Sequence, residues 1–168
     1  MPTTVAVNDR ATRERLSPAA IRGFLRLADL WGLSTEERQE LLGASVGRTT
    51  LATWARGETS TLSADQLMRV SYLLAIYEGL QRIWRRAPEL GDRWPRRRRQ
   101  EAPFGGHTPV ETLCRGGIPA FAAVRAYVDE MTGGPPSREE YAPPPTAAVP
   151  SGALDAPSGN HVGGTRAA

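Results

Sequence analysis

Residues 34–57 read STEERQELLGASVGRTTLATWARG, and this stretch decides the fold because it holds two short helical segments joined by a connector. Ser34 and Glu37 have the spacing of a capping box, so we expect a helix over Thr35–Leu42. A second helix is expected from Arg48 to about Ala55. Two short helices joined in this way are typical of the helix-turn-helix, whose second helix docks in the major groove of DNA.

The second of these helices has an apolar side and a polar side. Leu51 and Trp54 lie three residues apart and are expected to face the core. Arginine can bond guanine through two hydrogen bonds, and threonine hydroxyls can reach phosphates or base edges. The connector, residues 43–47, is longer than the usual turn, so an ordinary packed helix pair with solvated arginines is the alternative. The candidate DNA-binding residues are Arg48, Thr49, Thr50, Thr53 and Arg56.

Helical patterns continue on both sides of this pair. Upstream, Ser17 and Pro18 predict the start of a helix, and the polar residues 1–16 are expected to be disordered. Downstream, a capping box at Ser63 opens what we expect to be the longest helix, roughly Ala64–Arg85. No segment shows the alternating pattern of a β-strand, so the predicted fold class is all-α, with a helix-turn-helix domain over residues 17–87.

The second half of the chain predicts a small helical region over residues 88–134, interrupted by prolines and glycines. From Pro135 on, the chain is dense in Pro, Gly and Ala, and its few apolar side chains cannot offset the cost of ordering, so a disordered tail is expected over 135–168. The expected elements are a helical turn over Pro88–Trp94, an arginine run at Arg96–Arg99, a turn at Phe104, Gly105 and Gly106, a helix from Thr108 to about Cys114, a break at Gly116 and Gly117, and a helix over Pro119–Thr132.

Composition limits the function classes. The chain has 21 Lys and Arg against 18 Asp and Glu, a net charge of +3 that is compatible with nucleic acid without proving it. The single cysteine, Cys114, excludes an internal disulfide and a closed zinc site built on cysteines. The first fifteen residues lack the apolar run of a signal peptide, and no long apolar segment follows, so we expect a cytoplasmic protein away from membranes. No catalytic signature is present, and we expect no enzyme, no cofactor and no metal site.

The arginine run at Arg96–Arg99 leaves three interpretations open. It could contact phosphates, face an acidic protein surface, or be a solvated loop.

Taken together and in order, several stretches resemble the Xre/MbcA/ParS-type antitoxins, from about Leu16 to Gly134. They are LSPAAIRGFLRLADLWGLSTEERQELLG, TTLATWARG, LSADQLMRVSYLLAIYEGL, RW at 93–94, PFGGHTPVETLCRGG and VRAYVDEMTGG. The resemblance implies an Xre-like helix-turn-helix bundle followed by a toxin-binding region. In that family the partner is a RES-domain toxin, which degrades NAD, and the antitoxin blocks the active site of the toxin by direct binding.

The resemblance also implies which residues bind the toxin. The expected function is therefore the antitoxin of a type II toxin–antitoxin system, with operator DNA as a second partner for autorepression and with a homodimer left open. The alternatives are a stand-alone helix-turn-helix transcriptional regulator without a toxin and a regulatory subunit of an unrelated enzyme. The matched toxin-binding residues are Trp94, Phe104, Gly105, Gly106, Val124, Arg125, Tyr127, Gly133 and Gly134.

Overall fold

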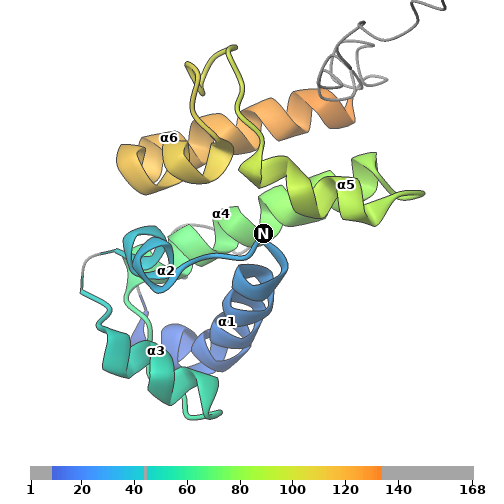
Figure 1. Ribbon diagram of the computed structural model, residues 1–168. Helices are drawn as coiled ribbons and strands as arrows, with labels where there is room; N and C mark the ends of the chain where they lie inside the picture. The colour runs from blue at the N-terminus through green and yellow to red at the C-terminus, as the bar shows by residue number, and fades with distance from the viewer. Residues whose placement is uncertain (1–8, 44, 134–168) are drawn as a thin grey trace, which may run out of the picture. The chain divides into compact units, whose positions relative to one another are not determined.

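The computed structural model describes residues 9–43 and 45–133, and within them it has six α-helices, one short 3₁₀ helix and no strand (Figure 1). The predicted all-α fold is therefore confirmed for this part of the chain. The tail predicted over 135–168 lies outside the described residues. None of the described helices is long and apolar enough to cross a membrane. The elements are α1 (Arg10–Leu30), α2 (Thr35–Leu42), α3 (Arg48–Ala55), α4 (Ala64–Ile83), α5 (Pro88–Arg93), η2 (Trp94–Arg96) and α6 (Pro109–Thr132).

The helix pair that decided the fold has the predicted bounds. The Ser34 hydroxyl accepts from the Glu37 backbone N–H at 3.2 Å, and the Glu37 carboxylate accepts from the Ser34 N–H at 2.8 Å. This reciprocal cap satisfies two N–H groups that the first turn of α2 would otherwise leave without a partner. At the other end, Gly43 adopts a φ of 91°, which favours glycine, and turns the chain into the connector.

The first helix starts earlier than predicted. α1 begins at Arg10, because the Asp9 carboxylate accepts from the Thr12 N–H at 2.8 Å and caps the helix. Residues 10–16, expected to be disordered, are therefore helical. Ser17, expected to be the cap, lies inside α1 at 1 % exposure. Its hydroxyl donates to the Arg13 carbonyl at 2.6 Å and accepts from the Leu62 N–H at 2.8 Å.

Helix α4 is the element against which the others assemble. It packs against α1, α5 and α6, and a single apolar cluster includes Phe24 of α1, Ile76 of α4 and Val128 of α6. α4 ends at Ile83 rather than Arg85, and with 20 residues it is shorter than the 21-residue α1, so the expectation that it is the longest helix was wrong. The regions predicted as a helix-turn-helix domain and a toxin-binding region thus share one core.

Helix α6 is broken where the glycines predicted a break. Gly117 has φ 58° and ψ −161°, so Pro109–Thr132 consists of two arms joined at an angle. The first arm opens with the capping box of Thr108 and Glu111, whose backbone–side-chain hydrogen bonds measure 3.1 and 2.8 Å. The second arm carries the apolar residues Phe121, Val124 and Val128 toward the core.

Candidate DNA-binding and partner-binding surfaces

Helix α3 places the candidate DNA-binding residues at or near the surface. Arg48, Thr49 and Arg56 are exposed, while Thr50 and Thr53 are half-buried. Thr49, Thr53 and Arg56 follow one another at intervals of four and three residues, so they share one side of the helix. This arrangement leaves polar side chains available to a partner along the whole length of α3.

The opposite side of α3 is held on the core. Leu51 and Trp54 are buried as predicted, and the Trp54 indole donates to the Ser60 hydroxyl at 3.0 Å. The long connector is fixed as well, because the Gln39 side chain of α2 donates to the Val46 carbonyl at 2.8 Å. Val46 is itself buried, so the connector is anchored to the core at this residue in spite of its length.

The charges around α3 are balanced by nearby carboxylates. Arg48 contacts Glu36 at 2.6 Å, and Arg56 lies 3.7 Å from Glu58 and donates to the Thr53 hydroxyl at 3.1 Å. A backbone hydrogen bond at the start of α2 is the largest cause that holds the pKa of Glu36 below its usual value, and the charge of Arg48 acts in the same direction. Exposed ion pairs of this kind are weak, so both guanidinium groups can exchange a carboxylate for a phosphate at small cost.

Three of the predicted toxin-binding residues form an aromatic cluster. The ring of Phe104 lies edge-on to the rings of Trp94 and Tyr127, with centroids 5.8 and 5.0 Å away, and Trp94 and Tyr127 are 6.2 Å apart. The guanidinium of Arg99 covers this cluster, 4.8 Å from the Trp94 ring and 5.8 Å from the Tyr127 ring. The structure therefore brings Tyr127 against residues more than twenty positions earlier in the sequence.

Several of these residues are too deeply buried to touch a partner directly. Trp94 and Phe104 are 1 % exposed and Val124 is fully buried. Their side chains belong to the core that α6, η2 and the loop before α6 share. In this conformation they shape the surface above them and do not form part of it.

The other predicted toxin-binding residues lie closer to solvent. Gly105 and Gly106 form the expected turn, with φ values of 55° and 90° that disfavour other residues. The Arg125 side chain is partly exposed and contacts Asp129 at 2.7 Å. Gly133 is exposed and caps α6, while Gly134 lies outside the described residues.

Arg96 has a role that the sequence did not reveal. Its guanidinium donates to the Trp31 and Gly32 carbonyls at 2.9 and 2.6 Å, at the end of α1. It also forms a two-pronged pair with Glu37 of α2, at 2.6 and 2.7 Å. The hydrogen bonds from Arg96 are the main reason that the pKa of Glu37 lies below its usual value. Arg96 thereby joins the segment after α5 to the entrance of the helix-turn-helix.

Two more arginines of the run are engaged within the chain. Arg98 donates to the Gly106 carbonyl at 3.1 Å, and Arg99, which covers the aromatic cluster, contacts Glu101 at 2.8 Å. Arg97 is exposed. Arg98 and Arg99 therefore stabilise the loop before α6. The interpretation of the arginine run as a solvated loop fits Arg97 but not Arg96, Arg98 and Arg99, which have contacts within the chain.

Comparison with known proteins gives the family. Residues 8–75, from the start of α1 into α4, match the family described as antitoxin Xre-like helix-turn-helix domain. The uncharacterized protein y4oB of Sinorhizobium fredii is 37 % identical over 117 residues, which cover 70 % of this chain and 87 % of y4oB. The chain belongs to the Xre-like antitoxin family. No solved structure matches it.

The environment of Cys114, the single cysteine of the chain, keeps its thiol protonated. Burial, and then the neighbouring Glu40, raise the pKa of the half-buried Cys114 to about 12, so its thiol is protonated at neutral pH. A protonated thiol is a poor nucleophile. Within residues 9–43 and 45–133, no group of three or more His, Cys, Asp or Glu side chains could hold a metal ion.

Proposed function

We propose that this chain is the antitoxin of a type II toxin–antitoxin pair, and that it neutralises a RES-domain toxin that degrades NAD. In this proposal the region from Trp94 to Gly134 binds the toxin and blocks its active site. Helix α3 binds operator DNA and represses the operon. The match of residues 8–75 to the antitoxin helix-turn-helix family carries the proposal, and the resemblance of residues 94–134 suggests the toxin class.

The burial of the aromatic cluster refines how the toxin would be bound. Trp94 and Phe104 act as supports, and the accessible groups of the second arm of α6 make the contacts. Arg125 and Tyr127 are partly exposed, and Glu130 is exposed near the end of the helix. A cleft that binds the anionic pyrophosphate of NAD is rich in positive charge or N–H donors, so a carboxylate such as that of Glu130 suits it.

The DNA-binding half of the proposal rests on the polar side of α3. The Arg48 and Arg56 guanidiniums lie near the two ends of the helix, and Thr49 and Thr53 lie between them. Contacts of arginine with phosphate release counterions, so affinity for the operator should fall steeply as salt rises. Replacing Arg48 and Arg56 together by alanine is expected to reduce that slope by about 2 if both contact phosphate.

A growth experiment tests the toxin half. The reading frame adjacent to this gene is expressed alone and together with this chain, and growth and cellular NAD are measured. Growth arrest with loss of NAD, relieved by this chain, is the expected result. A harmless neighbour would contradict the toxin half, and operator binding without a toxic neighbour would favour the stand-alone regulator.

Surface substitutions separate operator binding from toxin neutralisation better than truncation does. Removing residues after 90 would expose the α4 surface on which Val128 and Phe121 pack, so a truncated chain could lose activity by unfolding. Arg48→Ala with Arg56→Ala is expected to weaken operator binding and keep neutralisation. Glu130→Arg is expected to weaken neutralisation and keep operator binding. If both variants lost both activities while remaining folded, two separate surfaces would be excluded.

A further inference from the structure

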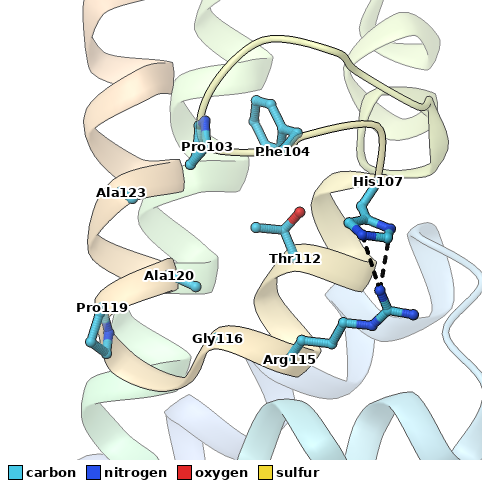
Figure 2. A pocket seen from close by; sticks show the side chains of 9 residues that line it. All are labelled: Pro103, Phe104, His107, Thr112, Arg115, Gly116, Pro119, Ala120 and Ala123. Atoms are coloured by element: carbon cyan, nitrogen blue, oxygen red, sulfur yellow. Dashed lines mark hydrogen bonds between the residues drawn. The ribbon is translucent and has the colours of Figure 1, made fainter.

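The break in α6 leaves a groove on the surface of the second half of the molecule. Its volume is about 400 Å³, and it lies between the two arms of α6 and the loop that precedes them. Figure 2 shows His107 of the loop pointing toward Arg115 of the first arm, with Gly116 between that arm and Pro119 of the second. The lining residues are Pro103, Phe104, His107, Thr112, Arg115, Gly116, Pro119, Ala120 and Ala123.

The groove is formed before any partner arrives. Phe104 packs against Trp94 and Tyr127 at 1 % exposure, so it is held in place from below. The loop closes on itself through the Gly106 N–H to Arg99 carbonyl bond at 2.7 Å and the Arg99 N–H to His107 carbonyl bond at 3.1 Å. A site that is already ordered spares its partner the entropic cost of ordering it.

One end of the groove carries the positive charge of Arg115. Arg115 lies 3.1 and 3.2 Å from the two ring nitrogens of His107, and in the described part of the chain no carboxylate pairs with it (Figure 2). Glu111 also lies at this end of the groove, 3.7 Å from Nδ1 of His107, but it accepts from the Thr108 N–H at 2.8 Å and lies 3.8 Å from Arg98, and it forms no ion pair with Arg115. Since an imidazole carries no negative charge and no carboxylate of the described residues forms an ion pair with Arg115, the Arg115 guanidinium is complementary to an added anion.

The remaining lining is mostly apolar and small. Pro103, Pro119, Ala120 and Ala123 leave room for a side chain to enter between the loop and the second arm. An apolar side chain that enters a preformed pocket, with a charge pair beside it, is the usual form of an anchor in a protein interface.

We propose that this groove receives an apolar side chain of the toxin partner, next to a toxin carboxylate that pairs with Arg115. The occupant is a segment of protein because an apolar pocket with a single cationic end suits an acidic peptide better than a nucleic acid, which would require several positive charges. The proposal deepens the proposed function and rests on it. The groove would be a second point of attachment to the toxin. It is separate from the end of α6, the part that blocks the active site in the proposed function.

The test measures how tightly the full chain binds the purified product of the adjacent reading frame, here called the adjacent-frame protein. Arg115→Glu reverses the charge, and Ala123→Trp fills the groove. Each change is expected to raise the dissociation constant by about tenfold or more, as for the loss of a central interface contact. The matched controls are Arg22→Glu on α1 and Ala122→Trp, because both residues are exposed, neither lines the groove, and Ala122 is the neighbour of Ala123. The controls are expected to bind like the unmodified chain.

The outcomes separate the groove from the wider function. If the unmodified chain binds and both groove variants bind equally well, the groove proposal is overturned while the antitoxin proposal stands. If the unmodified chain does not bind the adjacent-frame protein, both are overturned. If size-exclusion chromatography shows a dimer of this chain that Ala123→Trp dissociates and Ala122→Trp does not, the occupant is a second copy, which also overturns the proposal. Thermal unfolding of every variant confirms that each is folded.

Discussion

At the residue scale, Arg96 is the side chain that most clearly ties distant parts of the chain together. One guanidinium satisfies two carbonyls at the end of α1 and pairs with Glu37, some sixty residues away in sequence. Carbonyls at a helix end lack partners within the helix, so a donor there stabilises the end. Arg96 therefore fixes the entry into the helix-turn-helix.

Arg96→Lys tests this role. Lysine keeps the charge but cannot reproduce the planar fork, so several hydrogen bonds are lost. The free energy of unfolding, measured by urea denaturation, is expected to fall by about 1.5–3 kcal/mol, the range for hydrogen bonds to charged groups. Arg97→Lys, at the exposed neighbour, is the control and should change stability by less than about 0.5 kcal/mol.

The same pair gives a pH dependence. The pKa of Glu37 is lower in the folded chain than in the unfolded chain, where it is near 4.5. The stabilisation of the fold by ionised Glu37 is therefore fully present above the unfolded pKa, and it is lost as the pH falls through the folded pKa. Stability should therefore decline on acidification below about pH 4.5, and less steeply in Arg96→Met than in the unmodified chain. Equal slopes in the two proteins would show that the pair does not account for the shift.

Cys114 offers a second test at this scale. With burial raising its pKa to about 12, the native thiol is almost entirely protonated at pH 8. Alkylation by iodoacetamide is expected to be slower by about tenfold or more in the native chain than in the urea-unfolded chain, whose cysteine has a pKa near 8.5. Equal rates would mean that the thiol is exposed and ionises normally.

At the scale of elements, capping signals made the starts of α2, α4 and α6 predictable. Each depends on a pair of residues three positions apart, which is a local signal. The start of α1 was missed because Ser17 and Pro18 resemble a cap, whereas Ser17 is used inside the core. The long-range bonds of Arg96 have no local signal at all, and the burial of Trp94 and Phe104 depends on how α6 packs.

The crossing of α4 and α6 gives a test of this packing. A Cβ atom at Gly79 would lie 2.5 Å from Cγ1 of Val128, whereas one at Gly23 of α1 would lie 3.3 Å from the flexible end of Leu74. Gly79→Ala is expected to destabilise the chain by about 1–3 kcal/mol through overpacking. Gly23→Ala, which gains the same helix propensity with a looser contact, should be near neutral. Urea denaturation compares the two, and equal effects would contradict the close approach.

At the scale of the whole molecule, residues 9–133 place two proposed binding surfaces on one core. α3 presents its polar side at one place, and α6 with its preceding loop presents the groove and the end of the second arm at another. The division into residues 17–87 and 88–134 remains a functional prediction, because both parts contribute to the same apolar cluster. The sequence indicated the two functions through family resemblance, and it could not indicate that they share a core.

The central claim is that this Xre-like antitoxin inactivates an NAD-degrading partner by direct binding. The most direct measurement is NAD consumption by the purified adjacent-frame protein while the full chain is titrated in. The account predicts that NAD consumption falls to background as the chain reaches a fixed stoichiometric ratio, and that Arg115→Glu shifts the inhibition curve to higher concentration. NAD consumption that is absent, or that continues unchanged at saturating amounts of the chain, would contradict it.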